Sequence, residues 1–185
     1  MRLRFSVLIL LLFAGCNESP NRADIQKGET ATPAPAAASA SGQVHGDLRQ
    51  VMRGILFPNS NVVFAAQDKL DVKQAKDPST ATDPLASTYG GWQAVENAGI
   101  ALAESANLLT IPGRKCSNGR DAPINNEDWK KFVQELRDAG MNTYKAAQAK
   151  SSDKIVDAAG AMTEACSHCH DKYREKPAGE KDRCM

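Results

Sequence analysis

Apolar residues recur at helical spacing in four stretches of the chain. Positions i, i+3, i+4 and i+7 share one face of an α-helix, so apolar residues at this spacing mark a buried helix face. The pattern predicts helices over residues 44–68, 89–110, 126–149 and 152–175. No segment sustains the two-residue alternation of β-branched residues that is typical of strands. We therefore expect an all-α fold, an antiparallel four-helix bundle.

Proline residues interrupt this pattern at positions that matter for the fold. Pro58 removes a backbone donor inside the first predicted helix and is expected to kink it. Asp77-Pro78 and Asp83-Pro84 lie in a polar segment between the first two helices, and Pro112-Gly113 ends the second helix.

The N-terminal segment 1–15 has a basic start and a short apolar run, which is typical of an export signal. The run is shorter than the roughly 20 residues that span a bilayer. Leu12-Phe13-Ala14-Gly15-Cys16 resembles the lipobox of bacterial lipoproteins, in which the signal is cut before a cysteine that then carries the lipid. Phe13 departs from the usual leucine. The alternative is a small-residue cleavage site followed by an unmodified Cys16.

Three parts of the chain follow from these patterns. Residues 1–15 form the signal peptide, and the Pro/Ala/Ser-rich residues 16–43 form a flexible tether that buries little surface. Residues 44–185 are long enough to enclose one sizeable core and form the helical domain with a C-terminal tail. We expect an exported protein in the periplasm, tethered to the membrane as a lipoprotein through Cys16.

Composition and charge narrow the range of possible functions. The 185-residue chain has 23 basic and 22 acidic residues, a formal net charge of +1, which lacks the basic excess expected of a nucleic-acid-binding protein. The chain has five cysteines. Because five is odd, neither a set of disulfides nor a single zinc site accounts for all of them.

The last predicted helix contains Cys166-Ser167-His168-Cys169-His170, the C-x-x-C-H signature of c-type haem attachment. Two thiols at this spacing add to the two vinyl groups of one porphyrin, and the adjacent imidazole becomes an axial ligand of the iron. The sequence therefore predicts one covalently attached haem c, held by Cys166, Cys169 and His170. His168 occupies a variable position of the motif.

Two other chemistries use closely spaced cysteines. A thioredoxin-like redox pair requires a strand-to-helix context, and the pattern around Cys166 and Cys169 is helical. A zinc site needs two further ligands, for which the chain has only His45 and His168 to spare.

The region from Val44 to Arg174 resembles the class II cytochromes c, the cytochrome c′ and cytochrome c-556 family, which implies an up-down-up-down order of the four helices. Members carry the C-x-x-C-H motif near the end of the last helix, frequently followed by Tyr-Arg, as in Tyr173-Arg174. They also carry an Arg-Gln pair in the first helix, as in Arg49-Gln50. The resemblance implies Arg49 near a haem propionate and Arg174 near the proximal histidine; the alternative for both is solvated helix charge. The long first connection and the tail after Arg174 depart from the family pattern.

The residue on the other face of the iron decides the function. A methionine sulfur gives a six-coordinate iron suited to electron transfer, whereas an aliphatic side chain leaves a position open to small gases. Met162 shares a helix with His170, Met141 lies away from the apolar stripe of its helix, and Met185 is terminal. These positions are unsuited to reach the distal side.

Met52 remains, on the helix that supplies the distal residue in this family. The match is imperfect, because Met52 is three places after Arg49 and the family commonly uses the fourth, which is Arg53 here. The kink expected at Pro58 makes the register less predictable. The alternative for Met52 is core packing, with an aliphatic side chain covering an open iron: Leu48, Ile55 or Leu56.

Cys116 and Cys184 are the remaining two of the five cysteines. Cys116 follows the second predicted helix and Cys184 lies in the tail, and these two places are at the same end of an up-down-up-down bundle. Because exported proteins meet an oxidising compartment, we expect a disulfide between them. The alternative is a free thiol in the tail.

The expected function is that of a periplasmic one-electron carrier with His170 and Met52 as iron ligands and redox proteins as partners. The alternative is a five-coordinate cytochrome c′ that binds nitric oxide or carbon monoxide. A peroxidase-like enzyme lacks support, since no His, Asp or Glu falls clearly on the core face of the first helix. We expect membrane contact only through the lipid anchor. In this family homodimers often form through the outer faces of the first two helices.

Overall fold

The computed structural model describes residues 42–70, 75–174 and 183–184. The predicted signal peptide 1–15, the lipidation candidate Cys16, nearly all of the tether 16–43 and Met185 lie outside the described residues. Within the described ranges the regular structure is helical, with one isolated bridge between Lys115 and Asp121. None of the helices found there is long and apolar enough to cross a membrane.

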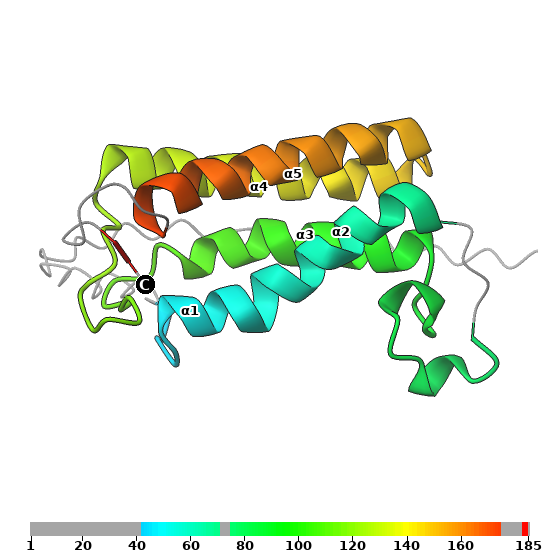
Figure 1. Ribbon diagram of the computed structural model, residues 1–185, viewed down its shortest axis with the longest axis horizontal. Coiled ribbons are helices and arrows are strands. Elements are labelled where there is room, and N and C mark those ends of the chain that lie inside the picture. Colours follow the sequence, from blue (N-terminus) through cyan, green and yellow to red (C-terminus); the bar gives the residue numbers. More distant parts are fainter. Residues whose placement is uncertain (1–41, 71–74, 175–182, 185) are drawn as a thin grey trace, which may run out of the picture. The chain divides into compact units, whose positions relative to one another are not determined.

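Four long helical segments form the described domain (Figure 1). The first consists of α1 (Leu48–Val51), a π-helical turn (Met52–Leu56) and α2 (Phe57–Lys69). The others are α3 (Trp92–Leu108), α4 (Glu127–Gln148) and α5 (Ser152–Tyr173), with two short 3₁₀ turns, Pro78–Thr80 and Pro84–Ala86, between α2 and α3. Each matches one predicted stretch, which confirms the all-α fold class.

The first helix begins later than predicted, at Leu48 rather than near residue 44. Asp47 is the N-cap residue of α1. Its side chain accepts a hydrogen bond from the backbone N–H of Gln50, and the Gln50 side chain accepts one from the N–H of Asp47 (both 2.8 Å). This reciprocal cap satisfies two donors that a helix start otherwise leaves free.

The predicted kink at Pro58 takes the form of the π-helical turn that precedes it. The N–H of Phe57 donates to the carbonyl of Met52, five residues back, instead of the usual four. Figure 1 shows the result as a bend between α1 and α2. Pro58 itself is near the start of α2, where a missing N–H is tolerated.

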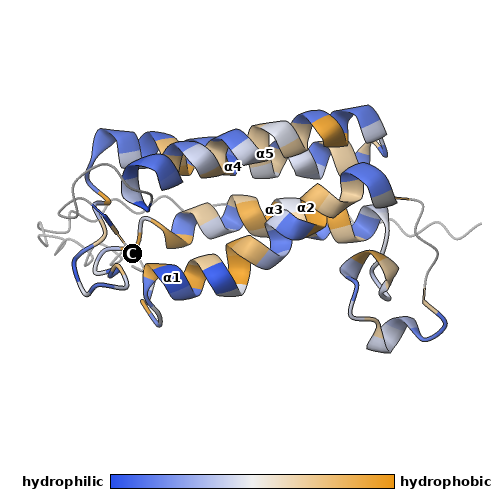
Figure 2. Cartoon of the chain, in the orientation of Figure 1, coloured by the Kyte–Doolittle hydropathy of each residue, from blue (hydrophilic) through white to orange (hydrophobic). Residues whose placement is uncertain are grey.

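The helices pack around one apolar core. α3 packs along α4, α4 along α5, and α2 against both α3 and α5. Figure 2 shows hydrophilic residues along the outer sides of α4 and α5 and more apolar ones on α2 and α3. The largest fully buried side chains are Trp129, Leu85, Leu102, Ile155, Met162, Val63, Val95 and Thr143. This arrangement is consistent with a helical bundle; the up-down-up-down order stays a prediction.

Two glycines allow α3 and α4 to approach closely. A Cβ atom on Gly99 would lie 2.6 Å from the backbone nitrogen of Tyr144, and one on Gly140 would lie 2.6 Å from that of Ala103. Both atoms met are backbone and cannot rotate away. The α3–α4 crossing therefore requires glycine on both helices.

At one end of the domain, called the closed end below, contacts of Arg114, Cys116 and Cys184 hold three segments of the chain together. Arg114 is only 4% exposed and donates to the carbonyls of Gly46 (2.5 Å) and Leu108 (3.1 Å). A disulfide joins Cys116 to Cys184, the pairing expected from the sequence. The N–H of Cys184 donates to the carbonyl of Tyr173 at 2.7 Å. The start of α1, the α3–α4 loop and the end of α5 are thus held together.

We predict that Gly140→Ala lowers the free energy of unfolding by about 1–3 kcal/mol, because α3 and α4 must separate to admit the methyl group. Gly160→Ala is the control, since Gly160 is exposed within α5 and its added Cβ meets nothing within 4 Å. That change is expected to stabilise by roughly 0.5–1 kcal/mol. Guanidinium unfolding of the haem-loaded proteins measures both. Equal effects of the two substitutions would contradict the tight crossing.

Candidate functional site

A cavity of about 630 Å³ lies near the closed end of the domain. All six predicted cofactor residues line it: Arg49, Met52, Cys166, Cys169, His170 and Arg174. The first two come from the helical segment 48–69 and the others from α5 and the residue after it. The volume falls within the roughly 300–1,000 Å³ of cofactor pockets. Residues more than 110 positions apart in the sequence, such as Met52 and His170, therefore share one space.

Helix geometry puts the motif on one side of α5. Cys169 and His170 lie three and four positions after Cys166, so the three side chains share one face of the helix. All three are half-buried. His168 lies off this face, half-exposed, and its Nδ1 is 2.8 Å from Oε2 of Glu135. It does not line the cavity, which agrees with its variable position in the motif.

The two thiols are unpaired and protonated at neutral pH. Burial raises the pKa of Cys169 to about 12, with smaller contributions from Cys166, Asp128 and Glu135. Burial also raises the pKa of Cys166, against a weaker opposing effect of Arg174. A redox-active dithiol depends on a lowered thiol pKa. The structure therefore gives the thioredoxin-like alternative no support.

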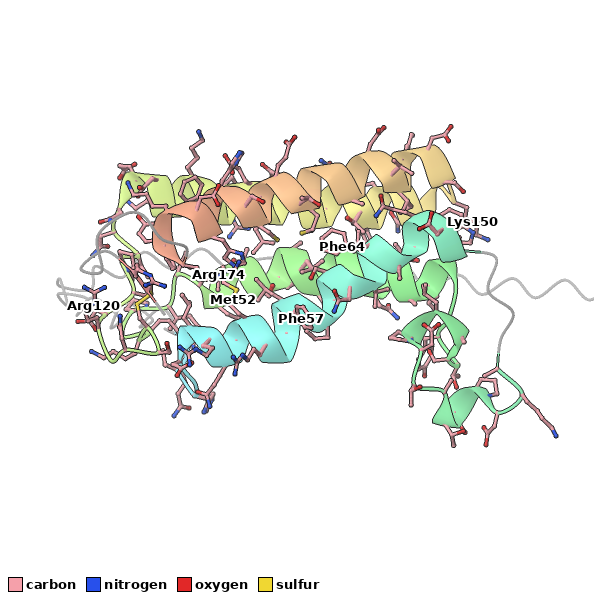
Figure 3. The ribbon with its side chains drawn as sticks, in the orientation of Figure 1. Met52, Phe57, Phe64, Arg120, Lys150 and Arg174 are labelled. Carbon is pink, nitrogen blue, oxygen red and sulfur yellow. A yellow bond between two sulfur atoms is a disulfide. The ribbon has the colours of Figure 1, made fainter. Side chains whose placement is uncertain are left out.

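Among the methionines in the described residues, Met52 is the one that lines the cavity. Its side chain is half-buried. Figure 3 shows Met52 and Arg174 in the space between α1 and the end of α5. Met162 is fully buried in the core, away from the lining. Of the aliphatic alternatives, Leu48 and Leu56 line the cavity and Ile55 does not.

The cavity walls are mainly apolar. Side chains from α3, the residue that follows it, and α4 complete them: Leu102, Leu109, Trp129, Phe132, Val133 and Leu136. Helical periodicity predicts all six on buried helix faces but does not assign them to a site. Periodicity identifies a buried face and does not distinguish contact with another helix from contact with a cofactor.

Arginine side chains give the cavity lining a positive charge. Arg49, Arg53 and Arg174 are exposed residues that contribute to the lining, and no Asp or Glu in the described ranges does so. Guanidinium groups bind carboxylates through paired, charge-assisted hydrogen bonds. Arg49 is thus in a position suited to a haem propionate. Arg53, the fourth position after Arg49, also lines the cavity, a placement that the sequence did not predict.

Trp129 and Tyr173 form a rigid aromatic wall. Their ring centroids are 5.0 Å apart with an interplanar angle of 73°, an edge-to-face contact. The indole nitrogen of Trp129 donates to the carbonyl of Leu109 at 3.1 Å. The Tyr173 hydroxyl donates to Oδ1 of Asp128 at 2.6 Å. Burial and this bond raise the pKa of Tyr173 to about 12, so the hydroxyl remains a donor.

Asp128 links the start of α4 to the end of α5. Besides Tyr173, it pairs through Oδ2 with Nζ of Lys172 at 2.8 Å. These hydrogen bonds, that of Lys172 first, lower the pKa of Asp128. The sequence held no signal for this connection, because it joins residues far apart in the chain.

The residues fit a covalently attached haem. The cavity offers two neutral thiols, an adjacent imidazole, a thioether from a second helix, apolar walls and guanidinium groups. Histidine nitrogen and methionine sulfur are the axial donors of cytochrome c iron. Within the described residues no group of three or more His, Cys, Asp or Glu side chains forms a metal-binding cluster.

Comparisons with known proteins agree with this class of site. The family model described as Cytochrome C′ matches residues 123–174, which cover α4, α5 and the whole C-x-x-C-H motif. The match supports a class II cytochrome c and implies a haem cofactor. No curated protein and no solved structure matches the chain.

We predict that Asp128→Asn destabilises the protein at neutral pH, because the bonds from Lys172 and Tyr173 lose their charged acceptor. The folded pKa of Asp128 lies below its unfolded value. Its stabilising effect is therefore complete above the unfolded pKa of about 3.9 and is lost as the pH falls through the lower folded pKa.

Unfolding free energies measured from neutral to acid pH test this. The gap between wild type and Asp128→Asn should narrow below about pH 4. Glu127→Gln is the control, because its ion pair with Lys130 is largely exposed and contributes little. A gap that stays constant into strong acid would contradict the role of the Asp128 carboxylate.

Proposed function

We propose that the chain is a c-type cytochrome that carries one electron, with His170 as proximal and Met52 as distal iron ligand. The observation that carries this proposal is that the C-x-x-C-H face of α5 and Met52 line the same apolar cavity. When bound, the haem supplies an iron that takes up and releases one electron without breaking a substrate bond.

The chain's own residues have separable roles in this proposal. Cys166 and Cys169 would hold the porphyrin through thioether bonds, and His170, near the end of α5, would supply an imidazole nitrogen to its iron. Apolar walls and the Trp129–Tyr173 pair exclude water and limit motion. A site that changes shape little between oxidation states favours electron transfer.

Gas binding is the second candidate function, favoured by one observation. Leu48 and Leu56 line the cavity beside Met52, and aliphatic side chains over an open iron would admit nitric oxide or carbon monoxide. The thioether in the same lining favours the electron carrier.

The proposal includes a location and partners. The segment 1–15 directs export, Cys16 carries a lipid, and residues 16–43 tether the domain to the membrane in the periplasm. Exported redox proteins are the electron partners, and a homodimer is compatible with the proposal. The signal-like sequence and the lipobox-like junction before Cys16 support this assignment.

Covalent attachment is the first property to test. In an exporting bacterial host that attaches c-type haem, the denatured wild-type protein should be heavier than the mature chain by one haem. A Cys166→Ala, Cys169→Ala variant should lose this increment, while Ser167→Ala, within the same motif, should retain it. Intact-mass spectrometry gives the answer. Extraction of all haem from the wild type by acidified solvent would contradict the thioether assignment.

The distal ligand is tested by Met52→Leu. We expect the wild type to have a low-spin spectrum that carbon monoxide leaves unchanged, and Met52→Leu to be high-spin and to bind the gas at once. Met162→Leu is the matched control, because Met162 is fully buried in the core outside the cavity. A high-spin, gas-binding wild type would replace electron transfer by the gas-binding function.

A further inference from the structure

Buried residues in the first helical segment follow an interrupted register. The buried residues are Leu48, Val51, Leu56, Ser60, Val62, Val63 and Ala66. Successive buried positions of an α-helix lie no more than four residues apart, but Val51 and Leu56 are five apart. The extra residue falls within the π-helical turn Met52–Leu56, where the Phe57 N–H donates to the Met52 carbonyl. A π-helical turn accommodates one more residue than an α-helical turn.

Pro58 gives this turn a physical cause. In an uninterrupted helix residue 58 would donate to the carbonyl of Gly54, but proline has no N–H and its ring collides with that carbonyl. The side chains that follow Pro58 satisfy one carbonyl of the turn and the carbonyl of Phe57, which comes directly after the turn. Asn59 Nδ2 donates to the Ile55 carbonyl at 2.7 Å, and Ser60 Oγ donates to the Phe57 carbonyl at 3.0 Å. Pro58, Asn59 and Ser60 together favour the π-turn.

The turn changes which side chain lies at the middle of the cavity-lining face. One face of the segment lines it, through Leu48, Arg49, Met52, Arg53, Leu56, Phe57 and Ser60. At about 100° per residue, an uninterrupted helix counted back from Ser60 would place Arg53 at the middle of this face. Because the π-turn absorbs one residue, Met52 takes that place. Met52 is accordingly half-buried and Arg53 exposed.

We propose that Pro58 is a positioning residue that, through the π-turn, presents Met52 rather than Arg53 at the centre of the haem cavity. This inference rests on the proposed function, in which Met52 is the distal ligand. It also accounts for the spacing after Arg49: the fourth position is Arg53, a charged residue of a kind that is rarely fully buried, and the π-turn brings the third position, Met52, to the middle of the lining face.

The test compares haem-loaded Pro58→Ala with Pro84→Ala. Alanine at position 58 supplies the missing N–H and removes the ring, so α-helical hydrogen bonding can replace the π-turn. We expect Pro58→Ala to lose the low-spin spectrum and to bind carbon monoxide, as Met52→Leu does. The Met52 side-chain methyl, followed by NMR in the reduced protein, should lose its large haem-induced shift. Pro84→Ala, in an exposed 3₁₀ turn, should retain both properties.

A rescue variant separates positioning from general damage. Gly54 is exposed within the π-turn, and nothing lies within 4 Å of its would-be Cβ. Deleting Gly54 in the Pro58→Ala background removes the extra residue, so Met52 regains its place in an uninterrupted helix. We expect the low-spin spectrum and the shifted methionine methyl to return. A variant damaged only in stability would not recover through a further deletion.

The outcomes distinguish this inference from the proposed function. If Met52→Leu leaves the spectrum unchanged, Met52 is not the ligand and the proposed function fails. If Met52→Leu abolishes the low-spin state while Pro58→Ala preserves it, only the role of Pro58 is overturned. Failure of the Gly54 deletion to restore Met52 ligation would also overturn it.

Discussion

The face of α5 that carries Cys166, Cys169 and His170 imposes the main constraint on this fold. These side chains must line one apolar space, so the other helices have to enclose a cavity at this end while packing tightly elsewhere. The Gly99–Gly140 crossing brings α3 and α4 into close backbone contact. At the closed end, Trp129 and Tyr173 form the wall between α4 and α5. Close packing and open space are thus provided by different residues of the same helices.

Interactions between distant residues hold the cavity in shape. Asp128 at the start of α4 accepts from Tyr173 and pairs with Lys172, both at the end of α5. The Cys116–Cys184 disulfide and the Cys184–Tyr173 backbone hydrogen bond add the α3–α4 loop and the tail to the same connection. Cys184 itself lines the cavity. The disulfide therefore contributes to the site as well as to the stability of the chain.

Periodicity was sufficient to predict the four helical segments and the all-α class, because burial on one helix face is a local property of sequence. The C-x-x-C-H motif was sufficient to single out Cys166, Cys169 and His170, which line the cavity together; their attachment to a haem is part of the proposed function. The first helix shows the limit. Ile55 and Asn59 fit the apolar stripe of an uninterrupted helix, yet Leu56 and Ser60 are the buried residues. Proline signals a disruption of the helix, but a kink and a π-turn both accommodate a residue that has no N–H. Likewise, Asp128 and Trp129 gain their roles from tertiary contacts that periodicity does not encode.

The same π-turn bears on the choice between electron transfer and gas binding. A straight first helix would turn a guanidinium toward an apolar cavity, where its desolvation is unfavourable. The additional residue leaves Arg53 exposed, although it still contributes to the lining, and brings a polarisable thioether to the middle of the cavity-lining face. Leu48 and Leu56 also line the cavity, so apolar cover for the iron was available without Met52. A backbone irregularity is unnecessary for an aliphatic lining alone. Its coincidence with Met52, at the middle of the cavity-lining face, supports the proposal that the sulfur is an iron ligand.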